Sequence, residues 1–497
     1  MTEEHSSLKQ IIDFRIEKLN KIIDSGVNPY PYSYSASHKS EDILKNEKQL
    51  DGKTVTIAGR LMSLRKMGKA SFCHVQDDAG RIQIYIRRDD IGVEAYQNFK
   101  LLDIGDFIGV EGYVFKTKMG ETSIYANVVT ILSKSIRPIP IVKEKEGEEF
   151  DSFADKEQRY RNRHLDLIVN HDVKETFIKR AKIISSIRQF LDNDGFIEVE
   201  TPVLQPLYGG ANARPFSTHH NSLDQELYLR IADELYLKRL IIGGLDKVYE
   251  LSKNFRNEGI DRNHNPEFTS LEFYQAYVDY EYMMDFVEKL IRSVADIVGD
   301  QKIIWGDMNI DLSKPFAREP IFGLLSDATG TDVSQLNEKE LIIICDKFKI
   351  DTPPKLNYGQ LLDLLMSKLV EPNLIRPTFV IDYPKAISPL AKKHRGGNPE
   401  LVERFELFIG GMEFANAFSE LNDPVDQRER FENQDKLGKE GDEEAHPVDE
   451  NFLQAVESGM PPTGGVGIGI DRLVMLLTNN RWIKDVILFP TLRDDSQ

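Results

Sequence analysis

The stretch 247–277, KVYELSKNFRNEGIDRNHNPEFTSLEFYQAY, constrains this chain more than any other part of it. It reads as two strands joined by a polar loop that ends in proline. Side chains alternate between the faces of a strand, so Arg256 and Glu258 share one face of the first strand, as Glu272 and Tyr274 do on the second. One face of the predicted hairpin therefore carries an arginine, carboxylates and a phenol. Periodicity alone also allows a plain face of solvated charges.

The motifs FRNEG, HNPEFT and ExY in this stretch resemble the second signature motif of class II aminoacyl-tRNA synthetases, and most closely that of the bacterial-type lysyl-tRNA synthetases. The resemblance implies that Arg256 holds the ATP α-phosphate and the amino acid carboxylate. It also implies that Glu258 and His264 contact ATP and that Phe268 stacks on adenine. The chemistry agrees, because a guanidinium fork matches phosphate and carboxylate oxygens in a plane.

The whole chain is of ordinary globular composition. Its 497 residues suffice for about two to four domains, and no apolar run approaches the roughly 18 residues of a membrane span. The acidic start MTEEHSSLKQ lacks a basic-then-apolar leader, which predicts no secretion signal. Cys73 and Cys345 stand far apart, which argues against a disulfide framework or a cysteine zinc site. We expect no membrane association and a cytoplasmic location.

The net charge of −18 hides a difference between regions. Residues 51–137 contain 13 Lys+Arg and 10 Asp+Glu, which gives +3, so the remainder carries −21. The 51–137 segment is therefore the part suited to phosphates, although +3 is a modest excess.

Residues 51–137 contain five strand-like runs separated by Gly, Asp and Lys turns, which predicts an OB barrel. Such barrels bind single strands through basic grooves and aromatic platforms. The candidate face comprises Phe72, His74, Gln83 and Tyr85, with Arg60, Arg65 and Lys69 beside it. Phe72 is equally consistent with a core aromatic. The run GRLMSLRKMGKASF…GRIQIY resembles the anticodon-binding domain of lysyl-tRNA synthetases, which implies that Phe72 and Gln83 sandwich an anticodon base.

The predicted fold class is α+β, with a five-stranded OB barrel followed by a class II catalytic domain built on an antiparallel sheet flanked by helices. The domain limits that we expect are an N-terminal helix and lead-in at 1–50, the barrel at 51–137, a linker at 138–170 and the catalytic domain at 171–497. A helical insertion is expected at about 333–375.

The segment FIEVETPVLQP, with Pro202, resembles the first class II motif, which implies a homodimer. The small-residue loop 209–216 would let a substrate approach the backbone closely. By resemblance this loop closes over the amino acid, with Gly210 near its ammonium, and Glu234 receives the α-amino group. Asp233 precedes Glu234 where many family members have proline.

The segment ERFELFIGGMEFANAFSELND (403–423) predicts a hairpin with a turn at its Gly-Gly pair. That turn places Glu406 and Glu413 on one face, where their repulsion would suit Mg²⁺ carrying ATP phosphates. Asn416 and Glu420 have the opposite parity, so only a bulge or strand twist brings all four into one pocket. The resemblance implies metal on Glu406 and Glu413, ATP also on Glu413, and substrate on Asn416 and Glu420.

A glycine-rich strand runs directly into a helix in MPPTGGVGIGIDRLVMLLT (460–478). The glycine spacing is not GxGxxG and no βαβ unit follows, which argues against a dinucleotide fold. The segment resembles the third class II motif, which implies that Arg472 contacts the γ-phosphate. The implied catalytic residues are Arg256 and Arg472. In the second motif, Asn263 precedes His264 where bacterial relatives often have arginine, and Arg262 is the neighbouring candidate for that contact.

The implied reaction converts L-lysine and ATP, with Mg²⁺, to lysyl-adenylate and pyrophosphate, and then transfers lysine to tRNA(Lys). A buried ε-ammonium needs anionic partners, and Glu272, Tyr274 and Glu420 supply two carboxylates and a hydroxyl. An aspartyl or asparaginyl enzyme would need other residues there, and a tRNA-independent paralogue that lysylates a protein would lack the barrel. A nonenzymatic nucleic-acid-binding protein with a retired catalytic domain is the third alternative, and the intact Arg256 and Arg472 argue against it.

Overall fold

The computed structural model describes residues 2–140, 143–145, 148–150, 153–353, 356–439 and 447–494. Parts of the predicted linker and of the predicted insertion lie outside the described residues. The chain divides into two compact units, Met1–Asp155 and Lys156–Gln497. Among the described residues, no helix is both long enough and apolar enough to cross a membrane.

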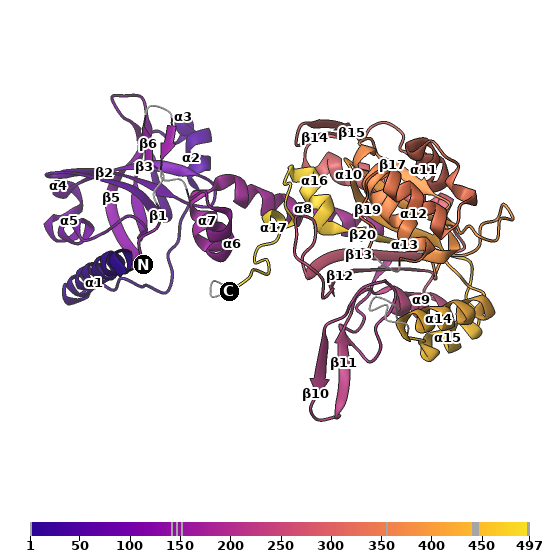
Figure 1. Ribbon diagram of the computed structural model, residues 1–497. Coiled ribbons are helices and arrows are strands. Elements are labelled where there is room, and N and C mark those ends of the chain that lie inside the picture. Colours follow the sequence, from indigo (N-terminus) through magenta and orange to yellow (C-terminus); the bar gives the residue numbers. More distant parts are fainter. Residues whose placement is uncertain are drawn as a thin grey trace. The chain divides into compact units, whose positions relative to one another are not determined.

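The first unit contains the closed five-stranded barrel that the strand pattern predicts (Figure 1). The strands pair in the order β1-β2-β3-β5-β4, and all neighbours are antiparallel except β3 and β5. Their bounds are Thr54–Met67 (β1), Ala70–Gln76 (β2), Arg81–Arg87 (β3), Phe107–Lys116 (β4) and Thr122–Ser133 (β5). The helices of this unit are Thr2–Asp24 (α1), Ser40–Lys45 (α2), Glu47–Leu50 (α3), Arg88–Ile91 (α4) and Val93–Lys100 (α5), and a small hairpin joins Lys143–Lys145 (β6) to Glu148–Phe150 (β7). Alternate strand residues, such as Val55, Ile57, Ile84 and Ile108, fill the interior.

The second unit is built on an eight-stranded sheet in the order β16-β17-β18-β19-β20-β13-β12-β8. Its strands are Ala317–Pro320 (β16), Thr378–Ile381 (β17), Arg404–Ile409 (β18), Met412–Ser419 (β19), Thr463–Gly469 (β20), Glu267–Ala276 (β13), Lys247–Phe255 (β12) and Ile197–Glu198 (β8). Only the edge pairs β16–β17 and β12–β8 are parallel among these described strands. The antiparallel prediction therefore holds for the six central strands.

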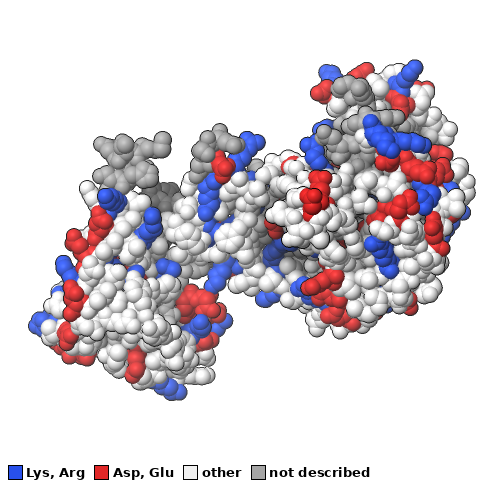
Figure 2. All heavy atoms as spheres, turned by 90° about the horizontal axis from the view of Figure 1, so that it is seen from below, with Lys and Arg blue, Asp and Glu red and all other residues white. Residues whose placement is uncertain are grey.

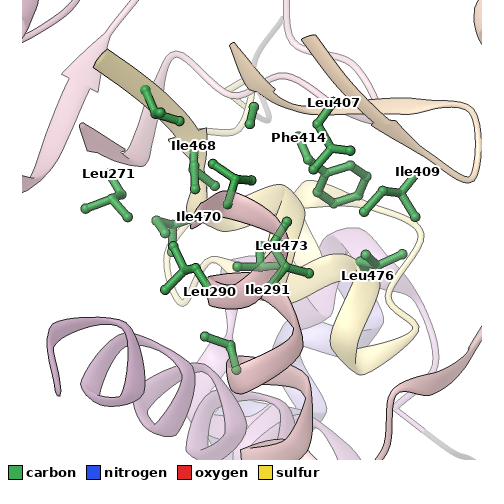
Figure 3. Packing of buried hydrophobic residues seen from close by; sticks show 14 of the residues in the cluster. Leu271, Leu290, Ile291, Leu407, Ile409, Phe414, Ile468, Ile470, Leu473 and Leu476 are labelled. Carbon is green, nitrogen blue, oxygen red and sulfur yellow. The ribbon is translucent and has the colours of Figure 1, made fainter. Parts of the chain in front are cut away.

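One face of this sheet is covered by helices α8 (His171–Asn193), α10 (Tyr280–Val298) and α16 (Ile470–Thr478). Figure 3 shows the packing of the apolar side chains on this face, where Leu271 and Ile468 from the sheet meet Leu290 from α10 and Leu473 from α16. Because strand side chains alternate, the next residues along β13, Ser270, Glu272 and Tyr274, point to the opposite face. Burying one face in this way leaves the polar face of the sheet for the cavity described below.

Other elements surround the sheet. The insertion between β16 and β17 contains α11 (Ile321–Thr329), α12 (Glu338–Lys347) and α13 (Tyr358–Leu365), with their own apolar cluster. Helices α9 (Glu234–Ile242), α14 (Pro424–Lys439) and α15 (Glu450–Glu457) share another cluster. The remaining elements of the unit are α6 (Lys156–Arg161), α7 (Arg163–Val169), α17 (Ile483–Val486), β9 (Leu204–Gln205), β10 (Ser217–His220), β11 (Gln225–Leu229), β14 (Lys302–Trp305) and β15 (Met308–Asp311).

The segment 156–169, part of the expected linker, packs within the second unit. Arg163 is 1% exposed, and its guanidinium donates to the carbonyl oxygens of Lys484, Ile487 and Leu488 near the C-terminus. The buried charge of Arg163 is paired with Asp166 at 2.5 Å, and the three bonds satisfy carbonyl oxygens in and just after α17. Figure 2 shows that acidic and basic side chains both occur across the face of the molecule in that view, so the charge of −18 is not gathered there in one patch.

Candidate active site

A cavity of about 550 Å³ lies in the second unit, against the polar face of strands β12, β13, β18, β19 and β20. The structure brings together here every residue that the sequence analysis assigned to lysine, ATP or metal. These residues are Gly210, Glu234, Arg256, Glu258, His264, Phe268, Glu272, Tyr274, Glu406, Glu413, Asn416, Glu420 and Arg472. The cavity is therefore assembled from segments spread over more than half of the chain.

Arg256 stands just beyond β12, where its backbone N–H donates to the Pro266 carbonyl oxygen at 2.9 Å. Its guanidinium lies 5.2 Å from the centre of the Phe268 ring. The buried Nε has no hydrogen-bond partner among the described residues, and burial lowers the pKa of Arg256. A guanidinium with a buried, unused donor that lines a cavity is well suited to bind an oxyanion.

Arg472, in the first turn of α16, connects three parts of the site. Its Nη1 donates to the backbone oxygen of Glu413 at 2.8 Å and pairs with a carboxylate oxygen of the same residue at 3.1 Å. Its Nη2 lies 3.2 Å from His264 Nε2, and His264 Nδ1 lies 2.9 Å from Asp261. Since arginine only donates, Nε2 accepts and Nδ1 carries the proton. The loop between β12 and β13 is thereby tied to α16.

Arg262, the candidate to replace the arginine that bacterial relatives often have at position 263, points away from the cavity. Arg262 Nε donates to the Arg481 carbonyl oxygen at 2.7 Å, and its guanidinium lies 5.7 Å from the Trp482 ring. Asn263, and not Arg262, lines the cavity. Glu258 also lines it, although its side chain is exposed.

A β-bulge resolves the parity problem of the β18–β19 hairpin. The turn pairs Phe408 with Glu413, as the Gly-Gly position predicts, but the next pairs are Leu407 with Ala415 and Glu406 with Asn416. Phe414 is therefore the extra residue on β19, and side-chain parity reverses after it. Glu406, Glu413, Asn416 and Glu420 consequently all line the same cavity.

Arg404 is a site residue that the sequence analysis missed. Its Nη2 donates to Glu406 at 2.5 Å, its Nε donates to Asn416 at 3.1 Å, and its guanidinium lies 4.6 Å from the Tyr383 ring. One side chain thus orients two predicted ligands. Its position two residues before Glu406, on the same strand face, was the available indication.

The donor set fits a magnesium ion that arrives with phosphates. Burial, with Glu413 nearby, raises the pKa of Glu406 to about 7, although Arg404 opposes the shift. A cation at these two carboxylates would relieve that cost. Among the described residues no group of three or more His, Cys, Asp or Glu has the arrangement of a metal site. Mg²⁺ commonly takes one or two carboxylates and completes its shell with water and substrate phosphates.

Three carboxylates, each more than nine-tenths buried, form the other end of the cavity: Glu234, Glu272 and Glu420. Glu272 accepts hydrogen bonds from the Tyr274 hydroxyl at 3.2 Å and from the backbone N–H of Asp233 at 3.2 Å. A proline at position 233 would lack that donor. Burial raises the pKa of Glu420 to about 8, and Lys238 opposes the shift. This end of the cavity is matched to cationic groups.

Gly465 makes the close approach at this end possible. A Cβ atom there would lie 2.1 Å from Glu420 Oε1 and 2.3 Å from the Tyr274 ring. Gly210 has φ +87° and leaves room beside Ala232 and Glu234, where a Cβ would come within 3.1 Å of each. Both glycines are thus required by local packing.

The barrel carries a separate candidate site, an aromatic platform on the outer face of β2, β3, β4 and β5. Phe72 lies opposite Tyr85 in the β2–β3 register, with ring centroids 4.7 Å apart. Phe72 is half-buried and is not part of the barrel core, so the core-aromatic alternative is wrong. Gln83 lies on the same face, diagonal to Phe72, and its amide contacts Glu121 at 2.6 Å and Ser123 at 3.0 Å.

Known proteins match both units. A family model described as class II tRNA synthetases (D, K and N) matches residues 155–493, and an OB-fold nucleic acid binding domain matches residues 55–132. Lysine–tRNA ligases from two strains of Porphyromonas gingivalis are 52% identical over 492 residues, which cover 97% of this chain and 85% of theirs. The lysine–tRNA ligase of Carboxydothermus hydrogenoformans is 51% identical over 492 residues, covering 99% of both chains.

Proposed function

This chain belongs to the class II tRNA synthetases that serve aspartate, lysine and asparagine, and from that premise we propose that it is an ATP-dependent lysine–tRNA ligase. It activates L-lysine to lysyl-adenylate with release of pyrophosphate, and then transfers lysine to the 3′ end of tRNA(Lys) with release of AMP. The observation that supports lysine within this family is the set of three buried carboxylates, Glu234, Glu272 and Glu420, in one cavity.

In the first step the lysine carboxylate attacks the α-phosphorus of ATP, and Arg256 holds the two reacting anions together. Its guanidinium has an unused buried donor for that purpose. Glu258 and His264 contact ATP, and Phe268, beside the arginine, provides a flat ring for adenine. Positioning and charge compensation supply most of the catalysis in phosphoryl chemistry of this kind.

Arg472 binds the γ-phosphate in this proposal. In the described structure its guanidinium is shared between the Glu413 carboxylate and His264, which are themselves proposed contacts of the ATP and its metal. Glu406 and Glu413 would hold Mg²⁺ with the ATP phosphates, and the bound ion would neutralise charge on the triphosphate. Arg404 keeps Glu406 and Asn416 in place.

Lysine itself is held at both ends. Its α-ammonium lies at Gly210 and Glu234, and Asn416 supports the backbone of the amino acid. Glu420, Glu272 and Tyr274 receive the ε-ammonium, because a buried cation needs anionic partners with satisfied hydrogen bonds. An aspartate side chain would meet the carboxylates of Glu272 and Glu420 and be repelled.

The barrel binds the anticodon of tRNA(Lys). The half-buried ring of Phe72 and the amide of Gln83 on one barrel face offer stacking and hydrogen bonding to an unstacked base. The OB-fold nucleic acid binding model matches this part of the chain.

A homodimer in the cytoplasm completes the proposal. Apolar side chains that are exposed in the isolated chain gather near the strand β8 and the segment after it: Ile197, Val203, Leu204 and Leu207. A second copy would bury them. Both cysteines are free and buried, which is compatible with a reducing compartment.

ATP–pyrophosphate exchange with each of the twenty amino acids tests this function. We expect exchange with lysine alone at low amino acid concentration, followed by charging of tRNA(Lys). Exchange driven by aspartate or asparagine would contradict the substrate assignment. The absence of exchange with any amino acid would point instead to a nonenzymatic nucleic-acid-binding protein.

A further inference from the structure

Lys238 is a buried cation at the lysine end of the cavity that the reaction described above does not use. It lies on α9, one turn after Glu234, and its side chain is fully buried. Its ammonium lies 2.5 Å from Glu234 Oε1 and also pairs with Glu420 Oε2. Phe452 of α15 lies on another side, 6.0 Å from the ammonium. Lys238 does not line the cavity, whereas both of its partners do.

The bridge connects residues that are far apart in the chain. Glu234 belongs to the first turn of α9, and Glu420 follows β19, so helix and sheet geometry alone do not fix the distance between their carboxylates. Burial would lower the pKa of Lys238, but the two carboxylates outweigh it and hold the pKa above its usual value. The ammonium therefore stays charged and keeps one oxygen of each carboxylate in place.

The second oxygen of Glu420 is left for substrate. Glu420 Oε1 is buried and has no hydrogen-bond partner among the described residues. A Cβ on Gly465, in the cavity wall, would lie 2.1 Å from that oxygen. In this arrangement the α-ammonium of lysine meets Glu234 and its ε-ammonium meets Glu420. The ammonium of Lys238, outside the cavity, fixes the distance between these two carboxylates.

We propose that Lys238 is a specificity-determining positioning residue: by bridging Glu234 and Glu420 it fixes the spacing between the α-ammonium and ε-ammonium sites, and so selects lysine over ornithine, which is one methylene shorter. This inference rests on the proposed roles of Glu234 and Glu420. Rigid anchors favour the chain length that spans them, whereas loosened anchors close around a shorter diamine. A single methylene difference is commonly worth about 10- to 200-fold in kcat/KM.

The test is ATP–pyrophosphate exchange by the full-length chain with lysine and with ornithine. Lys238→Arg retains the charge but replaces a compact ammonium with a larger planar group, and Lys238→Met removes the charge at similar volume. We expect the wild-type preference for lysine, about 100-fold, to fall below about tenfold in both variants. The KM for ATP should stay within about twofold, because the bridge does not touch the ATP end.

The barrel offers a matched control. Lys134 is also fully buried and bridges two carboxylates, Asp103 at 2.7 Å and Asp106 at 3.0 Å. Lys134→Met carries the same cost of a broken buried bridge, but in the other unit, so it should leave the lysine-to-ornithine ratio unchanged. If Lys238→Met does not fold, Lys238→Arg still decides the question, since it keeps a cation between the carboxylates.

Two results overturn the inference in distinguishable ways. If the Lys238 variants lose activity with lysine and ornithine in equal proportion, the bridge supports the fold or general binding and does not set the spacing, while the proposed function stands. If the wild-type chain shows no lysine-dependent exchange at all, the proposed function and this inference fail together.

Discussion

Glu420→Gln is the most direct test of how the cavity recognises lysine. Glu420 is 1% exposed, and its Oε1 has no hydrogen-bond partner among the described residues. A hydrogen bond to a charged group contributes about 1.5–3 kcal/mol. At 1.4 kcal/mol per factor of ten, losing the charge on the acceptor should raise the lysine KM by about 10- to 150-fold. The KM for ATP should change by less than about twofold, as ATP-site residues lie at the other end of the cavity.

The same variant should alter the pH dependence of lysine activation. A carboxylate attracts an ammonium only when ionised, and burial raises the pKa of Glu420 to about 8. At pH 7, below that pKa, Glu420 of the free wild-type enzyme is mostly protonated, so kcat/KM for lysine should rise as the pH approaches 8. Lys238, Glu234 and Tyr274 face this carboxylate, and the variant retains all three. In Glu420→Gln, kcat/KM for lysine should rise less over the same pH range.

Pyrophosphate exchange at several pH values, with lysine and ATP varied separately, measures both effects. Asp106→Asn is a suitable control, because it neutralises a buried carboxylate beside Lys134 in the barrel. It should leave the lysine KM unchanged. An unaltered lysine KM in Glu420→Gln would refute the assignment of this carboxylate to the ε-ammonium.

Three further results are expected. Phe72→Ala should lower kcat/KM for tRNA charging by about 5- to 150-fold, the value of one stacked base, and leave pyrophosphate exchange unchanged; equal loss of both would indicate misfolding. Gly465→Ala should abolish lysine activation, because the added Cβ would overlap Glu420 and Tyr274. The control Gly467→Ala should retain the lysine KM, because the nearest neighbour of its Cβ is 3.8 Å away. Excess chelator should stop exchange without changing the melting temperature. A large fall in the melting temperature would reveal a structural metal.

The central hairpin was predictable because its information is local. Strand alternation alone places Glu272 and Tyr274 on one face and Leu271 on the other, and the register of β12 with β13 agrees. The five barrel strands were predictable for the same reason, with apolar residues at every second position. The resemblance to class II synthetases then predicted that distant segments form one site, which periodicity cannot predict.

The contacts that escaped prediction all depend on tertiary structure. The spacing of Glu234 and Lys238 is visible as an i,i+4 pair on a helix, but nothing local shows that the same ammonium reaches Glu420. Arg404 reads as an ordinary strand arginine until its partners are known. Arg262 looked like a substitute phosphate ligand because it is adjacent in sequence, yet its Nε donates to the backbone carbonyl oxygen of Arg481.

The bulge at Phe414 shows why one strand can serve two parts of the reaction. Glu413 lies on the cavity face before the bulge, and Asn416 lies on it after. With regular alternation, Asn416 and Glu420 would point into the apolar layer under α10 and α16, where an unpaired carboxylate is very costly. The extra residue instead turns Ala415 and Ala417 into that layer, next to the Phe414 ring. A single local irregularity therefore lets the same strand hold the carboxylate that we propose for the metal at one end and lead into the carboxylate that we propose for lysine at the other.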